Sequence, residues 1–408
     1  MYIKRHIDVV VREMAKAFPA VVLTGSRQVG KTTLLRNAFP GASYSTLDRL
    51  DVLESARNDP ERFLKAQTEP MIIDEVQYAP HLFRYVKIAA DERRSTKGRF
   101  FLTGSQRYLM MQGVDESLAG RTGIVEMLGL SLREIEGCSF NRPFIPTDGY
   151  LESRKKALPV QSRYNVWDSI VRGDLPELYA DELLDAQRYY DSYIDSYLRR
   201  DVRDLAHVGD LTAFNRFMSF LALTHGQQLN KADLSARTGV AVATVNRWLS
   251  VLEASNIIYL LKPLYVNSGK RLAKTPKLYF LNSGLAARLC RITSGTDLEQ
   301  SVQAGAFLEG FVLAEVIKSH LNAKGAFPDI YYYRDSNRNE VDLILLDGSD
   351  LYPIEVKKAG LARSADIKGF SQLDNLSGFT RRSGAVLCTC TEPLPLPEGN
   401  WAVPIHYL

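Results

Sequence analysis

Residues 24–35 of this sequence of 408 residues read TGSRQVGKTTLL, and they indicate how its N-terminal region folds. Its residues 25–32 fit the pattern G-x-x-x-x-G-K-[ST], in which a glycine-rich turn leads into a helix and presents backbone N–H groups to phosphate oxygens. The apolar run 20–23 before it is typical of a strand, and 32–36 is typical of a helix start. The sequence therefore predicts a phosphate-binding loop (P-loop) rather than a chance Gly-Lys-Thr turn.

The residues of this loop have distinct expected roles in binding ATP and Mg²⁺. Lys31 is expected to reach the β- and γ-phosphates and to act in catalysis, and Thr32 is expected to place its hydroxyl on the metal. The two glycines permit backbone angles that a β-carbon would hinder. The candidate nucleotide-binding residues are Gly25, Ser26, Arg27, Gln28, Val29, Gly30, Lys31, Thr32 and Thr33.

A second motif, MIIDE at 71–75, has the pattern of a buried strand that ends in two carboxylates. Asp74 is a candidate metal contact through water. Glu75 is a candidate base that orients and activates the attacking water. An Asp-Glu pair alone is equally typical of an exposed strand end, but the P-loop upstream makes the catalytic interpretation the stronger one.

A third strand, RFFLTGS at 99–105, ends in small polar residues. Thr103 or Ser105 is a candidate to sense the γ-phosphate from a neighbouring strand. Arg107 and Arg121 follow, and either would supply positive charge to the transition state, in the same chain or from a neighbouring subunit. A solvated surface position explains Arg107 at least as well, so Arg121 is the preferred candidate.

Composition sets broad limits on the class of protein. The hydrophobic share of 45% and charged share of 24% are ordinary for a soluble globular protein. A net charge of +4 permits a nucleic-acid partner without requiring one. We expect no transmembrane helix, because no run of eighteen or more apolar residues occurs, and no secretory signal. The scattered cysteines, none in a C-x-x-C pair, indicate a reducing cytoplasm and no zinc site.

Four regions are expected along an α/β multidomain chain. Residues 1–137 alternate strands and helices, which predicts a parallel sheet with right-handed crossovers. Residues 138–225 form a loop and helical lid region. Its aromatic and aliphatic stripe over 189–205 is better explained as a buried helix face than as a base-stacking platform. A winged helix-turn-helix is expected over 226–280 and a further α/β domain over 281–408.

The winged helix is predicted by LNKADLSARTGVAVATVNRWLSVLEASNIIYLLKPL, residues 229–264, and the basic stretch after it. Thr244, Asn246 and Arg247 lie on one side of the expected second helix, which would read DNA in the major groove. The cations of the expected wing tip suit contact with phosphate. They are Lys270, Arg271, Lys274 and Lys277. A purely structural winged helix that packs against the ATPase remains an equal alternative.

A second chemical site is predicted near the end of the chain, where YYYRDSNRNEVDLILLDGSDLYPIEVKKAG covers 331–360. Asp342 starts one expected strand, Glu355 and Lys357 share a face of the next, and Glu309 comes from a helix upstream. Such carboxylates, Asp342 and Glu355 above all, can hold Mg²⁺, and the lysine can stabilise charge in a transition state. The ordinary charge alternation of an edge strand explains the same spacing.

The three strand motifs of the first region resemble those of the AAA-type ATPases that carry a C-terminal DUF4143 domain. The resemblance extends over essentially the whole chain through YLRRDVRDL, KLYFLNSGLAARL and RNEVDLIL…YPIEVK. It implies a C-terminal third with the PD-(D/E)XK nuclease fold, which is restriction-endonuclease-like, with Glu309, Asp342, Glu355 and Lys357 at matching positions. Val341 stands where the family usually has a proline, and many members of this nuclease-like superfamily have lost cutting activity.

Three functions are compatible with these motifs. The leading one is an ATP-driven, DNA-associated protein, in which ATP hydrolysis reorients the winged helix and a C-terminal domain that binds DNA, with cleavage left open. The second is a nucleotide-gated switch or scaffold that binds another protein. The third is an antitoxin-like or transcriptional regulator that acts through the winged helix. Oligomer formation is compatible with all three.

Overall fold

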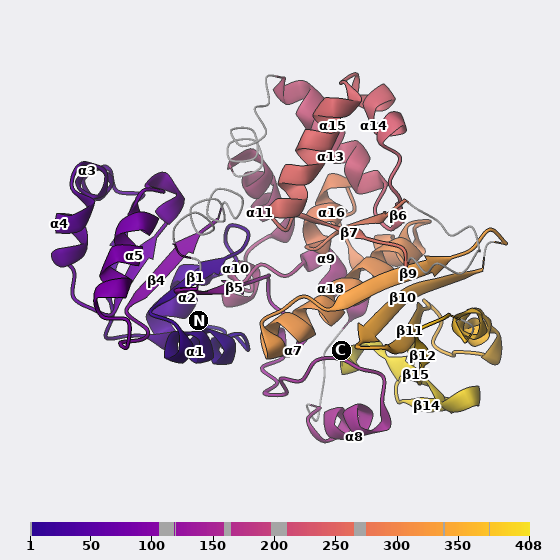
Figure 1. Ribbon diagram of the computed structural model, residues 1–408. Coiled ribbons are helices and arrows are strands. Elements are labelled where there is room, and N and C mark those ends of the chain that lie inside the picture. The colour runs from indigo at the N-terminus through magenta and orange to yellow at the C-terminus, as the bar shows by residue number, and fades with distance from the viewer. Residues whose placement is uncertain are drawn as a thin grey trace.

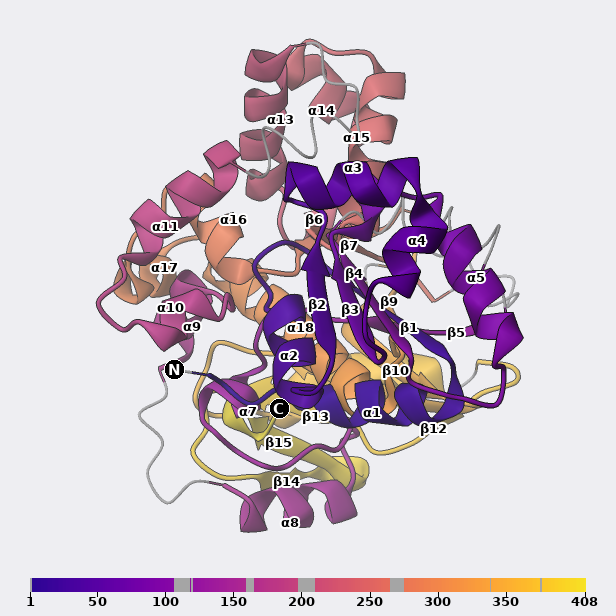
Figure 2. The same cartoon turned by 90° about the vertical axis from the view of Figure 1, so that its left-hand side faces the viewer.

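The computed structural model describes residues 2–408 apart from 106–117, 119, 159–164, 197–209, 265–274, 338 and 375. One sheet lies in the N-terminal part and a larger one in the C-terminal part, with helices between them and a helical tip that stands away from both (Figure 1). Figure 2 turns the N-terminal sheet toward the viewer.

The N-terminal sheet has five parallel strands in the order β2-β3-β4-β1-β5. Its strands are β1 (Ala20–Thr24), β2 (Ser43–Thr46), β3 (Met71–Asp74), β4 (Phe100–Gly104) and β5 (Thr122–Glu126). The helices beside it are α1 (Asp8–Ala17), α2 (Lys31–Ala38), α3 (Leu50–Asn58), α4 (Pro60–Lys65) and α5 (Leu82–Glu92), with the 3-10 turn η1 (Val76–Tyr78). The three central strands are buried throughout, as expected for a parallel sheet covered on both faces. The predicted parallel α/β fold is confirmed.

The region after this sheet is mainly helical. Its helices are α7 (Leu132–Ile135), α8 (Asp148–Lys156), α9 (Val166–Arg172), α10 (Glu177–Ala180), α11 (Ala186–Tyr193) and α13 (Leu211–Leu223). Tyr190 and Tyr193 of the predicted aromatic stripe are buried in the core, and Tyr189 is half-buried. The core interpretation is therefore confirmed for these described members of the stripe. Tyr197, Leu198, Val202 and Leu205 lie outside the described residues.

A pair of helices and a hairpin follow. Helices α14 (Lys231–Thr238) and α15 (Val242–Ala254) are joined through Gly239, whose φ of +73° gives the left-handed turn expected there. Strands β7 (Ile258–Leu261) and β8 (Lys277–Phe280) pair antiparallel, and β6 (Gln227–Gln228) pairs with β8. Lys277 corrects one prediction: it lies in β8 and is 4% exposed, so it is no solvated wing-tip cation. Lys270, Arg271 and Lys274 fall outside the described residues.

The C-terminal part is a seven-stranded mixed sheet beside a long helix. The helices are α16 (Ser283–Leu289), α17 (Gly295–Gln300) and α18 (Ala304–Lys324), with the 3-10 turns η3 (Ser364–Leu373), η4 (Pro397–Gly399) and η5 (Ile405–Tyr407). The strands are β9 (Asp329–Arg334), β10 (Glu340–Asp347), β11 (Asp350–Val356), β12 (Thr380–Arg381), β13 (Ala385–Cys388), β14 (Leu394–Leu396) and β15 (Asn400–Pro404). Strands β9, β10 and β11 pair antiparallel, and β11, β13 and β15 pair parallel.

Helix α18 joins the two sheets into one core. It is buried on nearly all sides, with apolar residues on every face and with Glu315 and Lys318 buried as an ion pair, and it contacts both α1 and β11. One apolar cluster continues from α1 and β1 through the helical region into α18 and the C-terminal sheet. The nucleotide loop and the C-terminal carboxylates are therefore placed by a common core.

Residues close to both ends of the described range contact α7 and α8. Glu134 at α7 pairs with Arg5. The nearby arginines bind the last carbonyls: Arg133 donates to Leu408, and Arg154 donates to Tyr407 at 3.3 Å and His406 at 2.9 Å. In both ribbon views α7 lies between the two chain ends (Figures 1 and 2).

Candidate functional site

The P-loop connects β1 to α2 at the carboxyl edge of the parallel sheet. Gly25 has a φ of +147°, and a Cβ there would lie 2.1 Å from the carbonyl oxygen of Met127. Gly30 caps the start of α2 with a φ of +93°. Both positions need glycine, since one has no room for a side chain and both adopt positive φ. The loop geometry therefore matches the expected phosphate-binding turn at a helix N-terminus.

Lys31 lies within the loop and is 6% exposed. Its Nζ donates to the carbonyl oxygens of Gly25 at 2.9 Å and Ser26 at 2.8 Å. Burial lowers its pKa to about 8, although Glu75 and Asp74 partly oppose that shift. A cation is thus held among the loop carbonyls and close to two carboxylates.

Asp74 joins the loop helix to the neighbouring strands. Its Oδ1 accepts hydrogen bonds from the hydroxyls of Thr32, at 2.9 Å, and Thr103. Its Oδ2 accepts from the Tyr44 hydroxyl at 3.0 Å. The two residues that the sequence assigns to the metal, Thr32 and Asp74, therefore lie side by side. A hydroxyl and a carboxylate are oxygen donors of the kind that Mg²⁺ prefers.

Glu75 follows in a left-handed conformation, with a φ of +56°. Such a backbone angle is uncommon for a residue with a side chain, and it often marks a functional position. The Glu75 carboxylate accepts hydrogen bonds from the Gln77 side chain and, at 3.4 Å, from the Ser105 hydroxyl. Of the two candidate sensors of the γ-phosphate, Thr103 thus contacts Asp74 and Ser105 contacts Glu75. Gln77 was not identified from the sequence.

Arg121 lies at the opposite edge of the sheet from the P-loop. Its carbonyl accepts from the amide of Ala20, the first residue of β1, at 3.3 Å, whereas the loop follows the last residue of β1. The length of β1 separates the two, about 16 Å at 3.3 Å per residue. Its guanidinium forms an ion pair with Asp91 at 3.1 Å. The predicted same-chain role of Arg121 is therefore wrong, because Arg121 directly precedes β5 and lies where the parallel strands begin, whereas the P-loop lies where they end. A role in a neighbouring subunit stays a prediction. Arg107 lies outside the described residues.

Arg5 braces the P-loop from the N-terminal segment and was not identified from the sequence. It is 3% exposed and donates to the carbonyls of Val29 at 2.7 Å, Leu128 at 2.8 Å and Gly129 at 2.9 Å. Its Nε also pairs with Glu134 at 3.1 Å. One guanidinium therefore fixes the loop to the segment 128–134 that leaves β5.

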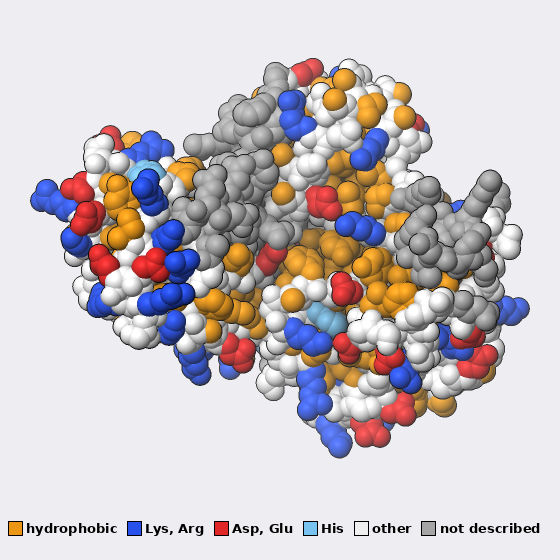
Figure 3. Space-filling view, viewed as in Figure 1, with side chains coloured by type: hydrophobic (Ala, Val, Ile, Leu, Met, Phe, Trp, Pro, Cys, Tyr) orange, Lys and Arg blue, Asp and Glu red, His pale blue; other side chains and the backbone are white. Residues whose placement is uncertain are grey.

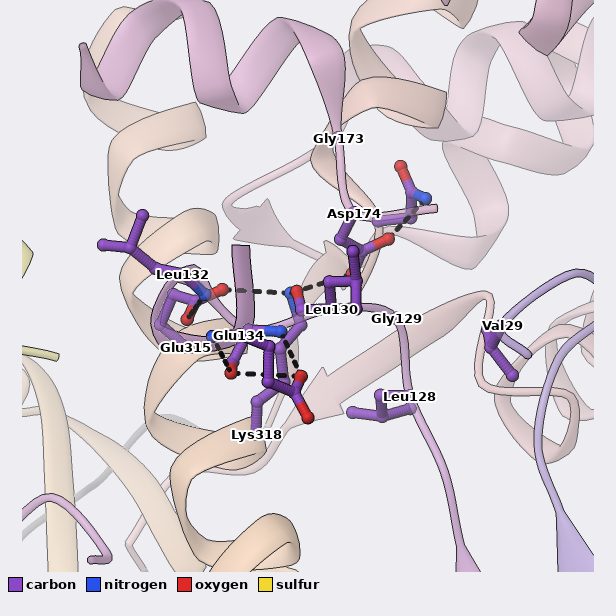
Figure 4. Close-up of polar contacts among 12 residues, drawn as sticks. Val29, Leu128, Gly129, Leu130, Leu132, Glu134, Gly173, Asp174, Glu315 and Lys318 are labelled. Atoms are coloured by element: carbon purple, nitrogen blue, oxygen red, sulfur yellow. Dashed lines mark hydrogen bonds and ion pairs between the residues drawn. The ribbon is translucent and has the colours of Figure 1, made fainter. Parts of the chain in front are cut away.

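That segment continues into a buried charge network on α18 (Figure 4). Lys318 contacts Asp174 at 2.8 Å, Glu315 at 3.0 Å and the Leu130 carbonyl at 2.9 Å. The amide of Leu132 donates to Glu315 at 2.8 Å. Burial alone would lower the pKa of Lys318, but Asp174 and Glu315 raise it above its ordinary value. A continuous set of polar contacts thus runs from the P-loop through Arg5 and 128–132 to α18.

The C-terminal carboxylates gather between α18, β10 and β11. Asp342 accepts from the Val356 amide at 2.9 Å, and Glu355 pairs with Lys357 at 2.6 Å, as their shared face of the strand predicts. Burial, assisted by the charge of Asp342, raises the pKa of Glu309 to about 7 and that of Glu355 to about 8. Burial likewise raises the pKa of Asp342. The predicted residues therefore share one electrostatic environment, which we call the C-terminal acidic site.

A lysine from outside the C-terminal sheet enters this acidic site. The Nζ of Lys277 lies 2.9 Å from Glu309 Oε1 and 2.7 Å from Glu340 Oε1. The hydroxyl of Tyr279, also in β8, donates to the same oxygen of Glu309. Among the described residues, no three His, Cys, Asp or Glu side chains surround a common point as metal ligands would. In this arrangement the acidic site does not fit the predicted Mg²⁺.

The comparisons with known proteins agree with the P-loop geometry. Family models match an AAA domain over 17–136, a domain of unknown function (DUF8612) over 163–296 and a domain of unknown function (DUF4143) over 304–408. An uncharacterised protein of Mycobacterium tuberculosis is 32% identical over 342 residues, 83% of this chain and 70% of its own length. A Mycobacterium bovis protein gives the same values. The chain belongs to this family of AAA-domain P-loop ATPases.

The predicted AAA and DUF4143 domains of this ATPase are thus confirmed, while a nuclease-like nature of the DUF4143 domain stays a prediction. Among solved structures, a Walker-type ATPase of Pyrococcus abyssi is similar with a TM-score of 0.38 at 16% identity, over 69% of this chain and 94% of that one. In the described part of the ATPase, every helix is too short or too polar to cross a membrane.

Proposed function

We propose that this ATPase binds ATP with Mg²⁺ and hydrolyses it at the P-loop. The observation that carries the proposal is the contact between the Thr32 hydroxyl and Asp74 directly beside Glu75. The loop N–H groups and the start of α2 would bind the phosphate oxygens. Lys31 would add its ammonium to the same oxygens, in addition to the two carbonyls that hold it now.

The hydrolytic step needs an oriented water and neutralised phosphate charge. Thr32 would hold Mg²⁺ directly and Asp74 through water, and the bound metal would supply positive charge against the phosphate oxygens. Glu75 would orient the water and accept its proton at a carboxylate oxygen. Gln77 and Ser105 hold that carboxylate in position. Thr103 or Ser105, which contact Asp74 and Glu75, would sense the γ-phosphate.

The test of this assignment is the Glu75→Gln variant. We expect its affinity for a fluorescent ATP analogue to stay close to that of the wild type, while its kcat falls by roughly 10²–10⁴. Glu92→Gln, which changes an exposed carboxylate at the end of α5, is the matched control and should turn over normally. Normal turnover in Glu75→Gln would remove Glu75 from the role of base.

We further propose that the ATPase associates with DNA through α14 and α15, which with the β7–β8 hairpin would form a winged helix-turn-helix. In support, Asn246 and Arg247 are exposed on α15 and Thr244 is half-buried beside them. This helical tip stands clear of both sheets, and Lys and Arg side chains lie on its surface (Figures 1 and 3). A helix of this kind reads the major groove, with flanking cations on phosphates. ATP hydrolysis would then reorient this tip and the C-terminal domain.

DNA association is tested by duplex binding across a salt series. We expect a linear fall of log affinity with log salt and a weaker, flatter dependence in Arg247→Ala. Asn246→Ala, which removes no charge, should leave the slope unchanged. An absence of binding at low salt, with ATP turnover indifferent to DNA, would favour a nucleotide-gated switch for a protein partner.

For the C-terminal domain the sequence proposes a nuclease-like site of Glu309, Asp342, Glu355 and Lys357. The position of Lys277 between Glu309 and Glu340 favours the second candidate function, a nucleotide-gated switch or DNA-binding regulator whose nuclease-like domain does not cut. The deciding assay incubates linear, nicked and single-stranded DNA with the wild type, Mg²⁺ and ATP. Cleavage that is lost in Asp342→Ala would establish a nuclease, and its loss in Lys31→Ala as well would show that ATP gates it.

A further inference from the structure

We propose that Lys277 is the built-in counter-ion of the C-terminal acidic site and keeps divalent cations out of it for as long as β8 contacts α18. The inference rests on the proposed identity of this site as nuclease-like and names the residue that determines which cation it holds. A second consequence is that the site is completed by a strand that belongs to the hairpin after α15.

The contacts of Lys277 are those of a buried structural cation. Its side chain is 6% exposed and that of Glu309 is 14% exposed. Burying an ammonium is costly unless carboxylates and hydrogen bonds surround it. Here Glu309 and Glu340 supply two carboxylates, and the ring of Tyr332 lies 5.3 Å from the Nζ. Such a cation is held in one place.

Lys277 competes with a metal for the same oxygen. Glu309 Oε1 receives both the Lys277 ammonium and the Tyr279 hydroxyl, and both residues come from β8. A divalent cation bound to that oxygen would have to displace these donors or lie directly beside an ammonium of like charge. Asp342 lies within the field of the same ammonium: its charge helps to raise the pKa of Lys277, and Lys277 opposes the rise that burial causes in the pKa of Asp342. The acidic site therefore already has a cation of its own.

The contact also joins two regions of the chain. Strand β8 pairs with β6 and β7 in a three-stranded sheet. The chain directly after β7 is bound to β9: the Leu264 amide donates to the Tyr332 carbonyl at 2.7 Å, and the Tyr332 amide donates to the Lys262 carbonyl at 3.1 Å. Glu309, by contrast, lies on α18. The cation of the acidic site is thus supplied by the hairpin after α15, whereas the carboxylates come from α18 and from strands of the C-terminal sheet.

The test measures Mn²⁺ binding to the full chain by electron paramagnetic resonance, without nucleotide or DNA. Asp342→Asn serves as the reference that lacks the acidic site. We expect the wild type to bind no more Mn²⁺ than Asp342→Asn. We expect Lys277→Met to bind one additional equivalent, which is lost in the double variant Lys277→Met with Asp342→Asn. Circular dichroism establishes that each variant is folded.

Two results would overturn the proposal. One is a wild type that binds an additional Mn²⁺ equivalent which Asp342→Asn lacks, a comparison that does not depend on any Lys277 variant folding. The other is a folded Lys277→Met, or a folded Lys277→Gln if the first does not fold, that gains no Mn²⁺. ATP turnover and DNA binding do not enter this readout, so failure of the proposed function remains distinguishable from failure of this inference.

Discussion

Arg5 and Val29 are joined by a 2.7 Å hydrogen bond from the arginine guanidinium to the carbonyl of the P-loop residue. The same guanidinium holds Leu128, Gly129 and Glu134, so the shape of the nucleotide loop depends on a side chain from the N-terminal segment.

We expect Arg5→Met to weaken ATP binding and to destabilise the fold. The loop loses its brace, and Glu134 is left as a buried carboxylate without its cation, a loss typically worth about 3–5 kcal/mol. Nucleotide titration and urea unfolding measure the two effects. Arg5→Lys is the matched control, because it keeps the charge beside Glu134 but cannot reach all four partners. Equal ATP affinity in Arg5→Met and wild type would show that the brace is irrelevant to the loop.

ATP affinity should depend on pH through Lys31. The pKa of Lys31 is lowered to about 8 by burial, and phosphate charge would raise it again, so binding takes up a proton when the solution is above pH 8. Affinity is then constant below pH 8 and falls as the pH rises above it, by up to about tenfold per unit. Calorimetry in buffers of different ionisation enthalpy measures the proton uptake. A Lys31→Ala chain should bind weakly and without this pH dependence; a flat wild-type profile up to pH 10 would contradict the assignment.

Replacing Arg121 should leave turnover in a single chain unchanged. Arg121→Ala removes an ion pair with Asp91 on the far edge of the sheet, and such partly exposed pairs contribute about 0–1 kcal/mol. We expect ATP turnover at high dilution to equal that of the wild type. A loss that appears only at high protein concentration would indicate action on a neighbouring subunit. A concentration-independent loss would contradict the geometry.

The acidic site should make stability fall as the pH rises. Burial and Asp342 raise the pKa of Glu355 from 4.5 to about 8, so the folded chain holds this proton more tightly than the unfolded chain does. The contribution of Glu355 is therefore fully present below pH 4.5 and is lost between pH 4.5 and 8, at about 1.4 kcal/mol per unit of pKa difference.

We thus expect Glu355→Gln to gain stability over the wild type as the pH rises through this window. Urea unfolding at a series of pH values measures the difference, and Glu182→Gln, which alters an exposed carboxylate, is the control with no such trend. A constant difference between Glu355→Gln and wild type across the window would show that Glu355 is ionised throughout.

The parts that the sequence predicts well are those set by local spacing. The P-loop and the MIIDE strand depend on one strand, one turn and one helix, and alternation alone places Glu355 beside Lys357. Arg5 and Lys277 carry no such local signal, because their partners lie far away in the chain. Lys318 has one local partner, Glu315, but its contact with Asp174 has no local signal either. Arg121 was misplaced for a related reason: its neighbours in sequence do not reveal which edge of the sheet it occupies.

The contacts of Arg133 and Arg154 with residues 406–408 have a consequence for synthesis of the chain. A ribosome delivers the parallel sheet and these two arginines well before it delivers the carbonyls that they bind. Until then two guanidinium groups destined for the interior must stay hydrated, since buried charges without partners are strongly unfavourable. The segment that carries α7 and α8 can therefore reach its final packing only after residues 406–408 have been translated, so its folding must wait for a stretch of chain more than 250 residues downstream.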